Sequence, residues 1–171
     1  MTTPRIVVVG LGPAGPEYVT EHTRAEIARV AHRYLRTDRH PSASLVPDAD
    51  TFDDVYEAAD TFADVYAEIA DRLAAAAQLH GEVLYAVPGS PLILERTVRA
   101  LRTDQRIECT IHPAMSFLDI AYARLGIDPV DANNPAAIPE LSKIKLPTGV
   151  PLVLLGETIS KSGGMPCTPT S

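Results

Sequence analysis

The chain has 171 residues with 46% hydrophobic content, enough for one full domain with a buried core. Fifteen Lys and Arg stand against 22 Asp and Glu, and the formal net charge of −7 argues against a broad surface for nucleic acid. The apolar runs are far shorter than the roughly 20 residues that span a bilayer, and the first residues lack a signal-peptide pattern. We therefore expect no membrane partner and a cytoplasmic location. Cys109 and Cys167 form no CxxC motif and have no clustered histidines beside them, so we expect neither a disulfide framework nor a metal site.

The first predicted element is a strand over residues 5–9, which runs directly into Gly10-Leu-Gly-Pro-Ala-Gly15. A buried strand that breaks into glycines is how an α/β protein opens a ligand-binding loop, although a turn without a ligand is the plain alternative. The glycine spacing matches the dinucleotide fingerprint, but Pro16 follows it, and proline has no N–H and restricts the residue before it. We therefore expect the next helix to begin only near Thr20 or Thr23, too late to cradle a pyrophosphate.

Strand and helix patterns alternate beyond this loop, which predicts an α/β fold with a mostly parallel sheet and helices on both faces. The predicted elements are a helix ending near residue 31, a strand over 33–37, one long or two short helices over 52–80, a strand over 82–87, a helix from Pro91 to about Arg102 with Ser90 as N-cap, a strand over 106–111 and a helix ending at 125–126. The acidic positions between residues 53 and 71 have the spacing of a solvated helix face. The aromatic positions Phe52, Tyr56, Phe62 and Tyr66 are expected in the core.

The carboxyl ends of parallel strands point the same way, so the loops that follow them should converge on one crevice. Asp38 and His40 are the best-placed candidates for an acid or base there, with a solvated loop as the alternative. Arg36 could hold an anionic group or pair with Asp38. The loops expected to meet are residues 10–16, 36–41, 88–91 and 112–117.

Several motifs occur together and in order over residues 4 to about 130. They are Val9-Gly-Leu-Gly-Pro-Ala-Gly15, Tyr34-Leu-Arg-Thr37 with His40-Pro41, Tyr85-Ala-Val-Pro-Gly-Ser-Pro-Leu92 with Glu95-Arg-Thr97, and Met115-Ser-Phe-Leu-Asp119 through Ala123-Arg-Leu-Gly-Ile-Asp-Pro129. Together they resemble the tetrapyrrole methylase family, in particular the methylase-like domain at the N-terminus of MazG-type nucleoside triphosphate pyrophosphohydrolases. The resemblance implies a two-domain α/β fold that binds S-adenosylmethionine between its domains, in a homodimer.

Carried over residue by residue, the resemblance also implies where the cofactor binds. The implied contacts are Pro13, Pro88, Gly89, Ser90, Ile93, Ser116 and Phe117. We expect a methylase-like α/β domain over residues 1–126, a linker over 127–150, and a remnant of a shortened second domain with a disordered tail over 151–171.

Three functional hypotheses remain open. The leading one is an S-adenosylmethionine-dependent methyltransferase-type domain with an unknown acceptor. The alternative is a truncated, non-catalytic or regulatory domain that binds a nucleotide-like ligand or a MazG-type pyrophosphohydrolase partner. The third is a flavin or NAD oxidoreductase, which requires a helix that begins within residues 12–15.

Overall fold

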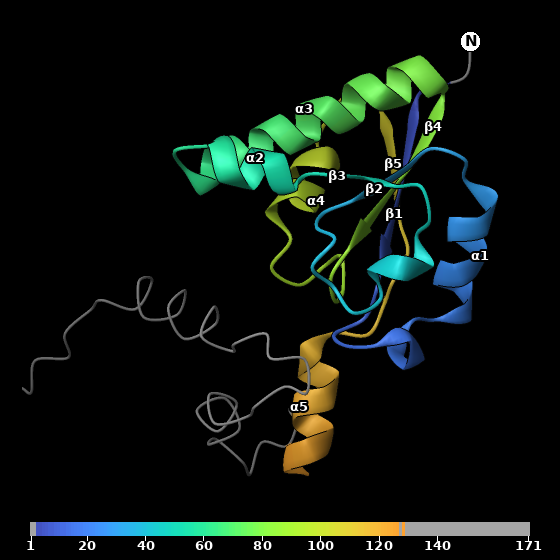
Figure 1. Ribbon diagram of the computed structural model, residues 1–171, viewed down its shortest axis with the longest axis vertical. Helices are drawn as coiled ribbons and strands as arrows, with labels where there is room; N and C mark the ends of the chain where they lie inside the picture. The colour runs from blue at the N-terminus through green and yellow to red at the C-terminus, as the bar shows by residue number, and fades with distance from the viewer. Residues whose placement is uncertain (1–2, 127, 129–171) are drawn as a thin grey trace, which may run out of the picture. The chain divides into compact units, whose positions relative to one another are not determined.

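The computed structural model describes residues 3–126 and residue 128 (Figure 1). The chain divides into two units, residues 1–117 and residues 118–171. The first unit holds a five-stranded sheet in the order β3-β2-β4-β1-β5, in which all neighbouring strands are parallel. The strands are β1 (Arg5–Gly10), β2 (Arg33–Leu35), β3 (Asp50–Thr51), β4 (Glu82–Val87) and β5 (Glu108–Ile111). The predicted α/β fold with a parallel sheet is confirmed.

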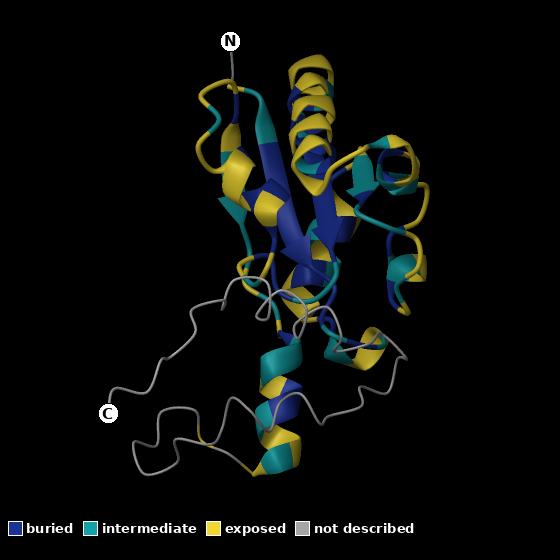
Figure 2. Cartoon of the chain, turned by 90° about the vertical axis from the view of Figure 1, so that its left-hand side faces the viewer, coloured by how far each residue is buried: buried dark blue, intermediate teal, exposed yellow. Residues whose placement is uncertain are grey.

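Helices of the first unit cover both faces of this sheet (Figure 1). The first unit contains α1 (Glu21–Arg29), α2 (Asp53–Ala58), α3 (Phe62–His80) and α4 (Arg96–Leu101), and the last helix, α5 (Phe117–Leu125), belongs almost wholly to the second unit. Helix α1 packs on one face, whereas α3 and α4 pack on the other. Figure 2 shows the central strands as the most buried part of the fold. Both faces of β1 and β4 are covered, which explains why these strands read as continuous apolar runs.

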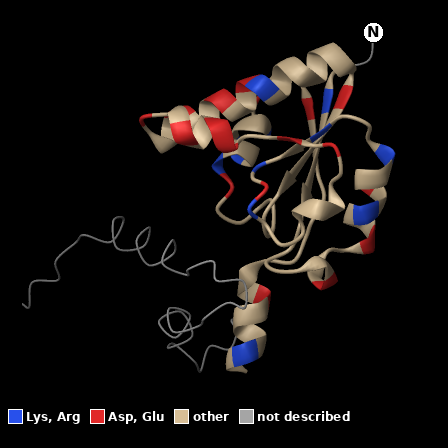
Figure 3. Ribbon diagram, in the orientation of Figure 1, with Lys and Arg blue, Asp and Glu red and all other residues tan. Residues whose placement is uncertain are grey.

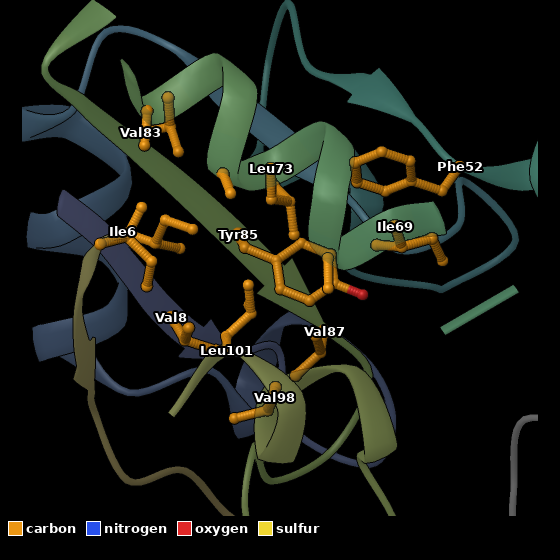
Figure 4. Close-up of a cluster of buried hydrophobic side chains, with 14 of the residues drawn as sticks. Ile6, Val8, Phe52, Ile69, Leu73, Val83, Tyr85, Val87, Val98 and Leu101 are labelled. Carbon is orange, nitrogen blue, oxygen red and sulfur yellow. The ribbon is translucent and has the colours of Figure 1, made fainter. Parts of the chain in front are cut away.

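Alternate side chains of the central strands supply two separate cores, as the two-residue period of a strand requires. Ile6, Val8 and Tyr85 belong to the core under α3 and α4, and Val7 and Leu84 to the core under α1. Figure 4 shows the first core, in which the ring of Tyr85 lies among aliphatic side chains of α3 and α4. These two apolar layers fix the strands and therefore the loops at their carboxyl ends.

Pro16 delays the first helix, as predicted. Residues 16–18 form a single 3₁₀ turn, and α1 begins only at Glu21. Thr20 is its N-cap, and its hydroxyl accepts a hydrogen bond from the Thr23 backbone N–H at 3.1 Å. The helix that a dinucleotide-binding oxidoreductase needs at residues 12–15 is therefore not formed.

The helix after β4 begins later than predicted. It starts at Arg96, so Ser90 is not its N-cap and Pro91 is not its first residue. Instead, the carbonyl of Ser90 accepts the Ile93 N–H at 3.1 Å and closes a turn. Leu94 then adopts a left-handed backbone with φ of 61°, which no helix interior allows, and this interrupts the run.

The segment between β3 and β4 forms two helices, one of the two predicted arrangements. Thr61 separates them and caps α3, because its hydroxyl accepts the Asp64 N–H at 3.2 Å. The acidic residues of α2 and α3 are exposed, as predicted, except for the half-buried Asp53. Figure 3 shows these acidic positions along the two helices. Phe62, predicted in the core, is 66% exposed because it is the first residue of α3 and precedes the helix's apolar stripe.

The two-residue strand β3 was not predicted, since it is too short to show alternation. It extends the sheet by pairing Asp50 and Thr51 with Tyr34 and Leu35. No helix in the described part of the chain is long and apolar enough to cross a membrane. The predicted linker over 127–150, apart from residue 128, and the predicted remnant and tail over 151–171 lie outside the described residues.

Candidate functional site

The strands β1 and β4 define the point at which the topology of the sheet reverses. The two strands are neighbours, but the chain leaves β1 through α1 towards β2 and leaves β4 through α4 towards β5, on the opposite side. In open α/β sheets, ligands bind in the crevice outside the carboxyl ends of two such strands. The loops after β1 and β4 are therefore the first place to look for a site.

These two loops are joined through their backbones. The Gly89 N–H donates to the Gly12 carbonyl at 2.8 Å, and the Gly12 N–H donates to the Gly89 carbonyl at 3.3 Å. Both residues have positive φ, 73° for Gly12 and 68° for Gly89, a backbone region that side chains make costly. A Cβ at Gly89 would meet no atom within 4 Å, so this residue borders open space at the edge of the sheet.

Gly10 marks the position at which three of the predicted loops meet. A Cβ placed on it would lie 2.2 Å from the Gly89 carbonyl oxygen, 2.5 Å from Cβ of Ala114 and 2.8 Å from Cδ of Pro91. The loops after β1, β4 and β5 therefore approach within contact distance, and only glycine leaves room for them. The convergence predicted from parallel strands is confirmed for these loops.

The loop after β2 joins the same group. The Ser42 hydroxyl donates to the Ala14 carbonyl at 3.0 Å, and both residues are buried. His40 accepts the Ser42 N–H at Nδ1, at 3.2 Å, and its ring also hydrogen-bonds to the backbone of Gly12. These bonds hold the loop in place, and an acid or base role for His40 stays a prediction.

The positions implied as cofactor contacts lie on these loops or directly beside them. Ser90 and Ser116 are buried, and the other five positions are half-buried: Pro13, Pro88, Gly89, Ile93 and Phe117. The loops that carry Pro13 and Gly89 are brought together by the Gly12–Gly89 hydrogen bonds. Contact of these residues with a cofactor stays a prediction.

Arg36 pairs with Glu95 and not with Asp38, the alternative suggested by the sequence. Its Nη1 donates to Oε1 of Glu95, and its Nε donates to the Tyr56 hydroxyl at 2.9 Å. The Glu95 side chain is only 4% exposed, so this is a buried ion pair. It ties the end of β2 to the segment after β4.

The electrostatics of the pair follow from its burial. Burial is the largest influence on Glu95 and raises its pKa, against the opposing effect of Arg36. For Arg36, burial works against the charge, but the Glu95 carboxylate and Tyr56 outweigh it, and the pKa is raised. An arginine stays protonated at any physiological pH. The buried Glu95 carboxylate is therefore the counter-ion of a permanent positive charge on Arg36.

The side chain of Asp38 is exposed, and its backbone N–H donates to Oδ2 of Asp53 at 3.0 Å. Asp53 also accepts the Thr37 hydroxyl at 2.6 Å. Asp53 therefore shapes this loop, and an acid or base role for Asp38 stays a prediction.

Replacing His40 with Gln is expected to flatten the fall in stability at acid pH. Burial lowers the pKa of His40 more than its bond to Gly12 raises it, so the folded chain binds the proton less readily than the unfolded chain does. The stability that neutral His40 contributes is complete above its unfolded pKa of about 6.5 and is lost as the pH falls from there through the lower pKa of the folded chain. Urea unfolding of both proteins at pH 7.5 and 5.5 measures the effect. An identical pH dependence in the variant would contradict it.

Sequence reasoning did not single out three residues that hold the site. Glu95 and Tyr56 are the partners of Arg36, and Asp53 anchors the loop after β2. Glu95 stands in a matching motif, but its burial had no local signal, because a carboxylate before a helix is ordinarily exposed. Asp53 was predicted on the solvated acidic face of the helix. The prediction is correct for the other acidic residues of α2 and α3, which are exposed, whereas Asp53 is half-buried.

Comparisons with known proteins agree with this fold. The chain is 36% identical over 137 residues to the uncharacterized protein YabN of Bacillus subtilis (strain 168), which covers 74% of this chain and 27% of that protein. Precorrin-6Y methylase from Archaeoglobus fulgidus shares 24% identity, with a TM-score of 0.52 over 75% of this chain and 61% of that one. Uroporphyrin-III C-methyltransferase from Thermus thermophilus, solved with S-adenosylhomocysteine, shares 17%, with a TM-score of 0.50 over 70% of this chain and 51% of that one.

The chain thus spans about a quarter of the length of YabN and about half to three fifths of the two solved enzymes. The structural likenesses show the same fold. The family model for tetrapyrrole (corrin/porphyrin) methylases matches residues 5–149, which include every strand and helix described above. By this match the chain belongs to the tetrapyrrole (corrin/porphyrin) methylase family.

Proposed function

We propose that the chain binds S-adenosylmethionine in the crevice at the carboxyl ends of β1 and β4 and serves as the cofactor-binding part of a methyltransferase. The observation that carries the proposal is the meeting of three loops at Gly10, at the point where the topology of the sheet reverses. Membership of the methylase family supports it, as does the likeness to an enzyme solved with S-adenosylhomocysteine.

The chemistry of the loops suits such a ligand. The delayed helix leaves no N-terminal dipole at the glycine loop, so a pyrophosphate has no cradle there. Adenosine and a sulfonium need apolar walls and backbone hydrogen bonds, which a loop of glycines and prolines provides. Pro13 and Pro88 stiffen the two loops, so little conformational entropy is lost when a ligand binds.

Methyl transfer depends mainly on alignment of donor and acceptor. The polar side chains along this edge are engaged in holding the loops: Arg36 with Glu95, His40 with Gly12, and Ser42 with Ala14. This arrangement is that of a rigid cofactor platform. A base is required only if the acceptor must lose a proton, and the acceptor is unknown.

Calorimetric titration with S-adenosylhomocysteine tests the proposal, with FAD and NAD as control ligands. The decisive variant is Gly89→Ala, whose new methyl group projects into the open space beside the crevice. Gly81→Ala is the matched control, because Gly81 has a similar φ of 82° and also borders open space, but it precedes β4 at the other end of the strand. We expect micromolar binding by the natural chain, at least about tenfold weaker binding by Gly89→Ala, and unchanged binding by Gly81→Ala. Equal loss in both variants, or tighter binding of FAD or NAD, would refute the proposal.

A specific observation supports a second candidate, a domain that binds a protein partner. Leu92 and Leu94 are 58% and 57% exposed, and Leu92 lines a cavity of about 430 Å³ together with Ile111 and Pro113. Exposed apolar side chains beside a cavity are typical of an interaction surface. A MazG-type pyrophosphohydrolase is the partner that the sequence resemblance suggests. Co-elution with such a hydrolase, abolished by Leu94→Glu, together with no binding of S-adenosylhomocysteine, would favour this candidate.

A further inference from the structure

Helix α1 and the residue after β5 bring two histidines and a glutamate together. Nε2 of His22 lies 2.7 Å from Nδ1 of His112, although 90 positions separate them in sequence. Glu26 lies one helical turn after His22, and one ligand atom from each of the three residues falls within 4.8 Å of the others. Two imidazoles and a carboxylate from two rigid elements are a donor set typical of transition-metal sites in proteins.

We propose that His22, Glu26 and His112 form a binding site for a divalent transition-metal ion of the zinc class, with one coordination position left to water. The ion would cross-link α1 to the segment after β5. The donor set of two nitrogens and one oxygen suits Zn²⁺ and does not suit Mg²⁺ or Ca²⁺, which prefer oxygen ligands only.

The two ring nitrogens already face each other across the position of the ion. Nε2 of His22 lies 2.7 Å from Nδ1 of His112, and an ion that binds both nitrogens takes the place of the hydrogen bond between them.

Only a small movement is required. A zinc–nitrogen bond of about 2.0–2.1 Å and tetrahedral angles place two ligand nitrogens roughly 3.4 Å apart, so the rings must separate from their present 2.7 Å by about 0.7 Å. His22 is exposed on the first turn of α1 and has room to move. Binding also shifts the His112 proton to Nε2, which is buried without a hydrogen-bond partner among the described residues. This cost makes a micromolar site more consistent with the structure than a nanomolar one.

Arg29 is the natural competitor for this site. It donates to Oε2 of Glu26 at 3.0 and 2.7 Å and also binds Glu82, so its positive charge lies beside the position that the ion would occupy. Both of these bonds to Glu26 fall on Oε2, which leaves Oε1 as the oxygen for the ion. Removing Arg29 should therefore strengthen metal binding, an outcome that a merely structural cluster would not show.

The test is calorimetric titration of the untagged chain with Zn²⁺, together with the visible absorption of bound Co²⁺ and thermal unfolding with and without Zn²⁺. We expect one ion per chain, a higher melting temperature with Zn²⁺, and at least about tenfold weaker binding after His22→Ala. Arg29→Ala should bind more tightly than the natural chain. Because His22 is exposed, its variant will fold even if His112→Ala does not.

The chain contains a matched control. His32 and His80 also form a pair, with stacked rings 3.7 Å apart, but the metal-ligand grouping found around His22 does not include them. The double variant His32→Ala/His80→Ala should keep full Zn²⁺ affinity and the full thermal shift. Zn²⁺ binding that is unaffected by His22→Ala, or that the control variant removes as completely, would overturn the proposal.

Discussion

Replacing Gly10 with Ala is expected to destabilise the chain by about 3 kcal/mol or more and to abolish ligand binding at the crevice. The added Cβ would lie 2.2 Å from a backbone oxygen of Gly89, and this contact cannot be relieved by rotating a side chain. The loop after β4 must move, and this movement breaks the hydrogen bonds that join Gly12 to Gly89. Urea unfolding, followed by titration with S-adenosylhomocysteine in the absence of urea, measures both effects.

Gly81→Ala separates this steric effect from the general cost of replacing a glycine. Gly81 has φ of 82°, so alanine there costs about 1–2 kcal/mol of backbone strain, but its Cβ would meet nothing within 4 Å. The steric argument therefore requires Gly10→Ala to be the more damaging change, although Gly10 has no unusual φ. If both variants lose the same stability, the three loops do not meet as closely at Gly10 as the structure indicates.

The sequence predicted the parts of the fold that depend on local patterns. Continuous apolar runs identified β1 and β4, and Pro16 delayed α1 as its chemistry requires. The start of α4 could not be predicted, because Ser90-Pro91 is an ordinary helix beginning and the left-handed Leu94 that prevents it has no signature in its side chain.

In the candidate site, too, some features could be predicted from the sequence and others could not. Its location followed from a rule of topology, since the carboxyl ends of parallel strands share one edge. The partners that join different loops did not follow, because these pairings connect residues far apart in the sequence. An anionic ligand group or Asp38, two positions away, was the expected partner of Arg36, and its partner in the structure is Glu95, 59 positions away. No local pattern places His22 and His112 in contact, since 90 positions separate them.

Hydrogen bonds and an ion pair between distant residues hold the loops of the crevice together. The loops after β1, β2 and β4 are each held by at least one bond from a loop on a different strand, so this part of the edge is assembled before a ligand arrives. A pre-assembled edge lowers the ordering cost of binding, which matters for a reaction that depends on alignment. Removing one of these interactions should then weaken ligand binding as well as lower the stability of the chain.

The buried ion pair between Arg36 and Glu95 is one such interaction, and its removal can be tested. Glu95→Ala is expected to lower the free energy of unfolding by about 3–5 kcal/mol, because it leaves Arg36 charged and largely buried without a partner. The matched control is Glu57→Ala, which breaks the ion pair between Glu57 and Arg39. The side chains of these two residues are 71% and 72% exposed, respectively. An exposed pair contributes about 0–1 kcal/mol. Urea unfolding of the two variants should give values that differ by at least about 2 kcal/mol, and similar values would show that Arg36 finds solvent or another partner.

The double variant Arg36→Met/Glu95→Leu separates stability from positioning. Apolar side chains of similar volume often replace a buried ion pair at little cost, so we expect stability within about 1–2 kcal/mol of the natural chain. Tyr56 loses the hydrogen bond from Arg36, which accounts for part of that cost. If the pair positions the segment after β4, this stable variant binds S-adenosylhomocysteine at least about tenfold more weakly. If it binds equally well, the pair serves stability alone, and the joined glycines Gly12 and Gly89 are sufficient to shape the crevice.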